Sequence, residues 1–186
     1  MTETSIIISG FGGQGTLFAG QLLAYAAMDY GKEVTWIPSY GPEMRGGTAR
    51  CIVIISDEKI GSPVARNPFA VIAMNVPSVN MYEPLVAPGG YMIINESLVD
   101  QKIERTDIQP IYIPGNDIAK ELGNIRITNM VMIGALLELV QVLPVDELKK
   151  ALDSHIPERH RGTLPINFEA IERGAKFVQE VLAEKV

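Results

Sequence analysis

The chain has 186 residues, of which 47% are hydrophobic, and this composition suits one domain with a sizeable core. Its formal net charge is −6, and no block of lysine and arginine stands out, which argues against a nucleic-acid-binding surface. No apolar stretch is long enough to span a bilayer, and the first residues lack the basic region of a signal peptide, so we expect a cytoplasmic protein.

The residues suited to metal or redox chemistry are few. The single cysteine, Cys51, excludes an internal disulfide and an iron–sulfur cluster held by four local cysteines. It lies in an apolar run, which is typical of a buried position. The two histidines, His155 and His160, lack the partners of a zinc site, so no metal site is predicted.

The first part of the chain alternates between strand and helix patterns. Residues 5–9 form a β-rich run, a glycine-rich turn follows, and residues 16–30 carry apolar side chains at helical spacing. A strand over residues 34–37 completes a β-turn-α-β unit, for which parallel strands are expected. Further strands are predicted over residues 48–55, 70–74, 91–94 and 111–113.

The remainder of the chain is mostly helical in pattern. Helices are predicted over residues 117–122, 128–142, 145–153 and 168–184, with a loop over residues 157–165. No linker composition marks a boundary between the two parts. We therefore predict an α/β fold over residues 1–186: one Rossmann-like, three-layer domain with a mostly parallel central sheet and a helical C-terminal part.

A glycine loop lies between the first predicted strand and the first predicted helix. Gly10, Gly12 and Gly15 match the dinucleotide-binding pattern Gly-x-Gly-x-x-Gly in the context that this pattern requires. Gly10 would permit the tight turn, Gly12 would let the backbone approach a pyrophosphate, and Gly15 would let the helix pack closely on the sheet. The alternative is that these glycines serve only a tight strand-to-helix turn.

The loop does not indicate NAD. An NAD-binding unit usually has an acidic residue at the end of its second strand, and residues 37–42 contain none. Glu33 precedes this strand, and Glu43 follows a turn that contains a proline. Arg45 could meet a ribose phosphate instead, which fits NADP or coenzyme A equally well.

A second unusual segment follows that strand. Residues 39–48 read Ser-Tyr-Gly-Pro-Glu-Met-Arg-Gly-Gly-Thr, at the carboxyl end of a strand, where α/β proteins bind ligands. The two glycines after Arg45 suggest that the backbone there lies close to another group. The alternative is an ordinary connection with solvated charges.

Taken together, residues 9–15 and 38–49 resemble the gamma subunit of 2-oxoacid:acceptor (ferredoxin) oxidoreductases. The resemblance continues through Ile-Gly-Ser-Pro at residues 60–63, Ala-Met-Asn at 73–75 and Pro-Gly-Gly at 88–90, and it fades in the helical C-terminal part. The form Ser-Tyr-Gly-Pro-Glu-Met-Arg is most similar to the 2-oxoglutarate and branched-chain 2-oxoacid (2-oxoisovalerate) members.

The resemblance implies a subunit of a heteromultimer that does no redox chemistry alone. Such a complex converts a 2-oxoacid, here with 2-oxoglutarate favoured, and coenzyme A to acyl-CoA and CO2, and passes electrons to ferredoxin. Thiamine diphosphate, Mg²⁺ and iron–sulfur clusters are implied only in partner subunits. The implied partners are alpha and beta subunits that bind thiamine diphosphate. A ferredoxin-like delta subunit could also belong to the complex. An isolated chain could pair with itself as a homodimer.

For this chain the resemblance implies a role in assembly and a share of coenzyme A binding, with no catalytic residue. We expect the amides of Gly12, Gly13 and Gln14 to contact a phosphate of coenzyme A, and Arg45 to add charge. The segment 39–48 could equally dock onto the catalytic subunits, or do both. The candidate binding residues are Gly10, Gly12, Gly13, Gln14, Gly15, Ser39, Tyr40, Arg45, Gly46 and Gly47.

Two other functions compete with this reading. One is a free-standing NAD(P)-binding Rossmann oxidoreductase domain, for which the sequence offers no Tyr-x-x-x-Lys pair or other acid–base set. The other is a scaffold subunit that binds no ligand. Bound nicotinamide in the purified protein would favour the first, and firm partner binding without any nucleotide would favour the second.

Overall fold

The computed structural model describes residues 3–41 and 47–184, and within them a six-stranded sheet has the order β2-β3-β1-β4-β5-β6. The strands are β1 (Glu3–Phe11), β2 (Glu33–Tyr40), β3 (Thr48–Ser56), β4 (Ala70–Ala73), β5 (Tyr91–Asn95) and β6 (Gln109–Ile113). The α-helices are α1 (Thr16–Asp29), α2 (Val76–Tyr82), α3 (Gly115–Glu121), α4 (Thr128–Val140), α5 (Val145–His155) and α6 (Leu164–Ala183). Short 3₁₀ helices span Glu83–Leu85, Ile125–Ile127 and Glu158–Thr163.

The predicted sheet with mostly parallel strands is confirmed, but the first unit differs from the expected one. β1, β4, β5 and β6 pair in parallel, whereas β3 lies between β1 and β2 and is antiparallel to both. β1 and β2 therefore run in the same direction without pairing. The connection between β2 and β3 is too short for a crossover, so the two strands form a hairpin instead.

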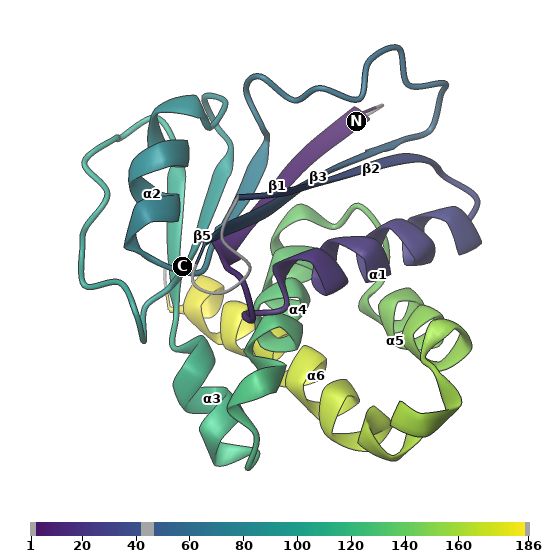
Figure 1. Ribbon diagram of the computed structural model, residues 1–186. Helices are drawn as coiled ribbons and strands as arrows, with labels where there is room; N and C mark the ends of the chain where they lie inside the picture. The colour runs from purple at the N-terminus through teal and green to yellow at the C-terminus, as the bar shows by residue number, and fades with distance from the viewer. Residues whose placement is uncertain (1–2, 42–46, 185–186) are drawn as a thin grey trace.

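The sheet has a different helical cover on each face, and alternate residues of β1 show the division. Ile6 and Ile8 belong to the core beneath α1 and α4, whereas Ile7 belongs to the smaller core beneath α2. Figure 1 shows α1 and α4 on one side of the sheet and α2 on the other. The predicted three-layer arrangement is thus present, with α6 packed behind α4 as a further layer.

The contact between α4 and α6 depends on glycine. A Cβ atom built on Gly134 of α4 would overlap the backbone of Ile171, and one built on Gly174 of α6 would overlap the backbone of Val131. The two helices therefore approach each other at backbone distance. Because α4 is covered by the sheet on one side and by α6 on the other, nearly all of its residues are buried, which explains its continuous apolar sequence.

Two predictions about the elements were wrong. Helix α2 was not expected, although Asn75 begins it by accepting a hydrogen bond from the amide of Ser78 at 3.0 Å, and Pro77 lies in its first turn. Residues 157–165 are not a loop, because they form the 3₁₀ helix Glu158–Thr163 and the start of α6. In the part of the chain that the structure describes, no helix is both long enough and apolar enough to cross a membrane.

Candidate functional site

The glycine loop connects the carboxyl end of β1 to the start of α1, as predicted. Gly13 and Gly15 have φ angles of 97° and 72°, so the left-handed conformations of this turn occur at these two glycines. A Cβ atom on Gly15 would lie 2.5 Å from Nδ2 of Asn129, which donates a hydrogen bond to the carbonyl of Gly15 at 3.1 Å. Gly15 therefore allows close packing against α4, whereas close packing of the helix on the sheet was predicted.

Two of the three amides expected to meet a phosphate already have partners within the protein. The Gly12 amide donates to the carbonyl of Gly47 at 2.9 Å, and the Gln14 amide donates to the carbonyl of Phe11 at 3.1 Å. The side-chain Oε1 of Gln14 accepts from the Phe11 amide at 2.6 Å and from Asn75 at 3.3 Å. Gly12 and Gln14 therefore shape the loop, whereas the amide of Gly13 has no hydrogen bond among residues 3–41 and 47–184.

A pocket of about 220 Å³ adjoins the loop on the α4 side of the sheet. Its lining residues come from the glycine loop, the end of β4, the start of α3, the 3₁₀ helix Ile125–Ile127 and the start of α4, and they are Gly13, Gln14, Met74, Asn116, Ile125, Arg126 and Thr128. Asn116 is held by Asn95, whose Nδ2 donates to Asn116 Oδ1 at 3.1 Å. The pocket therefore lies at the carboxyl edge of the parallel strands, where open α/β sheets bind ligands.

This pocket favours an anion. Arg126 is exposed and has no ion pair within the described ranges. Helix α1 starts beside the pocket, and no side chain caps its first amides. Those amides carry the positive end of the helix dipole, so amide and guanidinium donors lie near one small pocket.

The remaining predicted residues lie at the paired ends of β2 and β3. Ser39, Tyr40 and Gly47 are described, and Gly47 contacts the glycine loop through Gly12. Arg45 and Gly46 lie outside the described residues. Ser39 and Tyr40 line a second pocket of about 220 Å³, together with Gly41, Thr48, Arg50 and Met81. This second pocket lies on the α2 side, because Arg50 donates to the hydroxyl of Tyr82 at 2.8 Å.

The sequence analysis did not identify Arg126, Asn116 or Arg50. Arg126 follows Asn124, whose side chain accepts from its amide at 3.0 Å and so begins the 3₁₀ helix before α4. An asparagine at this point signals a helix start, but nothing in the local sequence indicates that the arginine two residues later lies beside the glycine loop. That proximity comes from the tertiary structure alone.

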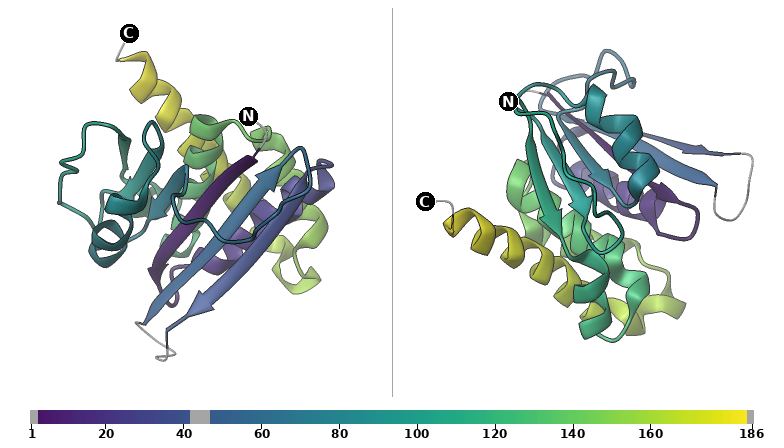
Figure 2. Two further views of the ribbon diagram at one scale, coloured as in Figure 1. Left: turned by 90° about the horizontal axis from the view of Figure 1, so that it is seen from above. Right: turned by 90° about the vertical axis from the view of Figure 1, so that its left-hand side faces the viewer.

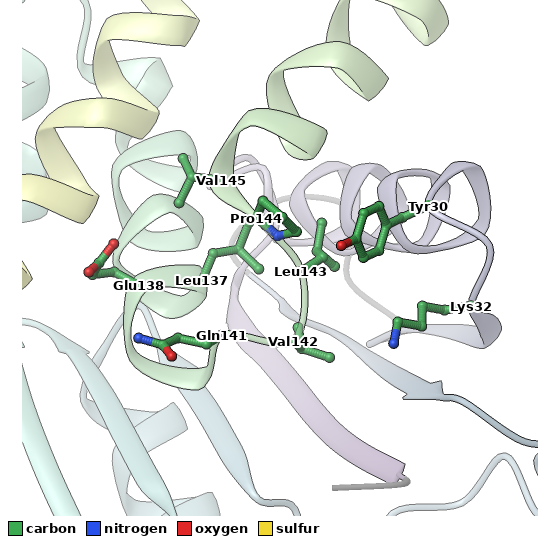
Figure 3. A pocket seen from close by; sticks show the side chains of 9 residues that line it. All are labelled: Tyr30, Lys32, Leu137, Glu138, Gln141, Val142, Leu143, Pro144 and Val145. Atoms are coloured by element: carbon green, nitrogen blue, oxygen red, sulfur yellow. The ribbon is translucent and has the colours of Figure 1, made fainter.

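A larger pocket, of about 440 Å³, lies away from all of the predicted site residues. Figure 3 shows it between the end of α1 and the end of α4, with Tyr30 and Lys32 on one side and Glu138 and Gln141 on the other. Lys32 is already paired with Asp57. The start of α5 also lines it, and none of its lining residues belongs to the two motifs, so pocket size alone does not identify the candidate site.

Neither a reactive thiol nor a metal cluster is found in the described part of the chain. Burial raises the pKa of the Cys51 thiol to about 11, which keeps it protonated and unreactive near neutral pH. Residues 3–41 and 47–184 contain no group of three or more His, Cys, Asp or Glu side chains placed to hold a metal ion.

Comparison with known proteins gives one consistent result. Residues 5–177 match the family described as pyruvate ferredoxin/flavodoxin oxidoreductase. The 2-oxoglutarate synthase subunit KorC of Methanocaldococcus jannaschii is 35% identical over 179 residues, which cover 95% of this chain and 94% of that protein. The ketoisovalerate oxidoreductase subunit VorA of Methanothermobacter marburgensis is 34% identical over 181 residues, which are 97% of this chain but only 37% of VorA.

Solved structures agree with these relatives. The gamma subunit of a keto/oxoacid ferredoxin oxidoreductase from Geobacter sulfurreducens PCA has a TM-score of 0.81 and 30% identity, covering 95% of this chain and 99% of that one. A 2-oxoglutarate:ferredoxin oxidoreductase from Magnetococcus marinus has a TM-score of 0.87 and 25% identity, covering 97% of this chain and 32% of that one. The predicted resemblance to a gamma subunit is confirmed, and the chain belongs to the pyruvate ferredoxin/flavodoxin oxidoreductase family.

Proposed function

We propose that this chain is the gamma subunit of a 2-oxoacid:ferredoxin oxidoreductase, an assembly that converts a 2-oxoacid and coenzyme A to acyl-CoA and CO2. The Methanocaldococcus jannaschii relative, which matches over nearly its whole length, is named as a subunit of 2-oxoglutarate synthase, and this supports 2-oxoglutarate as the substrate. The VorA match supports a branched-chain 2-oxoacid as the second choice. Electrons pass to ferredoxin in this proposal, and the chain is not active alone.

The proposal assigns the redox and carbanion chemistry to partner subunits. Thiamine diphosphate supplies the carbanion stabilisation that the decarboxylation needs, and alpha and beta subunits hold it with Mg²⁺. One buried cysteine cannot hold an iron–sulfur cluster, so any clusters belong to the partners or to a ferredoxin-like delta subunit. What remains for this chain is to bind the partners and to bind part of coenzyme A.

The observation that carries the coenzyme A assignment is the pocket beside the glycine loop. Coenzyme A has phosphate groups, and this pocket combines the Gly13 amide, the uncapped start of α1 and the guanidinium of Arg126. At about 220 Å³ it suits a phosphate group and not the whole cofactor, which supports a site shared with another subunit. The Magnetococcus marinus relative was solved with coenzyme A bound, which agrees with this assignment.

In this proposal, several residues of the glycine loop have roles other than the phosphate contact expected from the sequence. Gly12 and Gln14 hold the loop in shape through their own hydrogen bonds, and Gly13 and Arg126 provide donors to the phosphate. Gly10 and Gly15 are required for packing, because a Cβ on either would meet neighbouring atoms at 2.9 Å or less. The contribution of Arg45 and Gly46 stays a prediction.

The test is steady-state kinetics of the whole complex carrying Arg126→Ala. Loss of a charge-assisted hydrogen bond, worth about 1.5–3 kcal/mol, should raise the KM for coenzyme A about tenfold or more. The KM for the 2-oxoacid should change little, because the thiamine-bearing subunits bind that substrate. Arg66→Ala is the matched control, since Arg66 is also exposed and lies in the connection between β3 and β4. An unchanged KM for coenzyme A in a folded complex would contradict the assignment.

The family-level proposal has its own test. The tagged chain is purified under anaerobic conditions from its own cell, and the accompanying proteins are identified by mass spectrometry. We expect two larger subunits, and an eluate that reduces ferredoxin with a 2-oxoacid and coenzyme A. A chain that elutes alone with bound NAD(P) would instead support a free-standing oxidoreductase domain.

A further inference from the structure

The second pocket, on the α2 side of the sheet, is a polar cleft with an apolar rim. Its floor is formed by neighbouring strands, since Ser39 of β2 and Ser9 of β1 lie directly opposite Arg50 of β3 in the register. Its wall is Met81 of α2. The end of β2 and the start of β3 extend past the end of β4, whose last residue, Ala73, lies opposite Ser9 (Figure 2). The cleft therefore lies on a projecting part of the molecule.

Arg50 is held in position by a buried side chain of α2. Its Nη1 donates to the hydroxyl of Tyr82 at 2.8 Å, and Tyr82 is buried, so the guanidinium is held in place. No ion pair of Arg50 occurs in residues 3–41 and 47–184, although the chain as a whole is acidic, with a net charge of −6. A guanidinium that is ordered before binding loses less entropy when it pairs with a carboxylate.

The rim of the cleft is unusually apolar for a solvent-exposed surface. Tyr40 is 72% exposed, Met81 is 49% exposed and Phe11 is 38% exposed, although all three are large hydrophobic residues. Phe11 lies opposite Thr48, which lines the cleft. Aromatic residues, methionine and arginine are the residue types enriched at protein–protein interfaces and at their energetic centres. A small-molecule site would not need this exposed rim.

From these observations we infer that the cleft formed by Ser39, Tyr40, Thr48, Arg50 and Met81 is a docking site for a partner subunit. The partner inserts an acidic side chain that pairs with Arg50, and apolar side chains beside it cover Tyr40 and Met81. The hydroxyl groups of Ser39 and Thr48 donate to the same carboxylate. This inference rests on the proposed function, because it assumes that the chain is part of a complex.

The site is separate from the phosphate pocket, which makes the two roles testable independently. Arg126 lies on the α4 side of the sheet and Arg50 on the α2 side, with the Gly12–Gly47 contact between them. Replacing Arg50 should therefore weaken assembly without changing coenzyme A binding, and replacing Arg126 should do the reverse.

The experiment compares complexes purified with the tagged wild-type chain, Arg50→Glu and the control Arg66→Glu. Each complex is diluted and its dissociation is followed by native mass spectrometry. Reversal of a paired charge at an interface should raise the dissociation constant about tenfold or more, whereas Arg66→Glu should stay within about twofold of the wild type. Raised salt should weaken the wild-type complex more than the Arg50→Glu complex.

A second variant keeps the test valid if Arg50→Glu disturbs α2 through Tyr82. Tyr40→Ser changes a side chain that is 72% exposed, so it should fold normally and still weaken the complex severalfold. A photo-cross-linking amino acid at position 81 should join the chain to a partner peptide that contains Asp or Glu next to apolar residues. A cross-link to a peptide without a carboxylate would overturn the inference.

The outcomes separate this inference from the proposed function. If the wild-type chain purifies without partner subunits, the proposed function and the inference fail together. If the partners co-purify equally with the wild type, Arg50→Glu and Tyr40→Ser, only the docking site is wrong. If Arg50→Glu leaves assembly intact but raises the KM for coenzyme A, the cleft binds an anionic ligand, which also overturns the docking site.

Discussion

Glycine has opposite roles in two regions of this molecule. At the crossing of α4 and α6, Gly134 and Gly174 face the backbone of the other helix, and no side chain would fit there. In the loop after β1, Gly13 has a φ of 97° and nothing within 4 Å of the position where a Cβ would lie. The helix crossing needs glycine because no Cβ atom fits there. The loop needs glycine for its left-handed backbone conformation, and the space beside Gly13 stays open. The environment, and not the residue type, separates a glycine needed for packing from one needed for its backbone conformation.

The largest effect is expected at the helix crossing. Gly174→Ala would force the added methyl group against the carbonyl of Val131, and backbone cannot move aside as a flexible side chain can. We expect the free energy of unfolding to fall by about 3 kcal/mol or more, measured by urea denaturation. Gly61→Ala is the control, since its Cβ would enter open space, and it should stay within about 0.5 kcal/mol of the wild type. Equal stability of the two variants would contradict the close crossing.

Gly20 of α1 is also a packing glycine, because it faces the sulfur of Cys51 where α1 lies on the sheet. Burial raises the pKa of this thiol from 9.0 to about 11. Above pH 9 the unfolded chain loses the thiol proton while the folded chain keeps it, so stability falls as pH rises. Between pH 8.5 and pH 11 the wild type should lose about 2 kcal/mol more than Cys51→Ala. Parallel stability curves for the two proteins would show that the thiol is not buried as described.

An intermediate effect is expected at Gly15, which combines packing with conformation. Gly15→Ala places a side chain at a φ of 72° and displaces Asn129 from its hydrogen bond with the Gly15 carbonyl. We expect a loss of about 2 kcal/mol in the free energy of unfolding. The double variant Gly15→Ala/Asn129→Ala should be less destabilised than the sum of the single variants, because both remove the same hydrogen bond. Simple additivity would show that the two residues are not coupled.

The smallest effect on stability is expected at Gly13. Gly13→Ala meets no neighbouring atom, so only the conformational strain of the added side chain remains, about 1 kcal/mol. The KM of the complex for coenzyme A should nevertheless rise severalfold, because the methyl group narrows the approach to the pocket. If Gly13→Ala lowers stability as much as Gly174→Ala, the proposed contrast between the two regions is wrong. If it changes neither stability nor the KM, the loop does not contact the cofactor.

Much of the fold could be predicted from local patterns. Buried strands and amphipathic helices leave characteristic periods in the sequence, so the alternation of elements, the strand–glycine loop–helix order and the helical C-terminal part were predicted correctly. Helix α2 was missed because its seven residues are too few to establish a helical period. The direction of β3 was missed because a buried strand has the same apolar sequence whether it pairs parallel or antiparallel.

The sequence by itself determined the family and the position of the glycine loop, because two long motifs in the right order are specific and are read residue by residue. Only the tertiary structure decided which groups line the pockets beside this loop. It committed the amides of Gly12 and Gln14 to internal hydrogen bonds, and it brought Arg126 to one side of the loop and Arg50 to the other. These arrangements join segments far apart in the chain, and their geometry depends on how helices and strands pack, which no local pattern encodes.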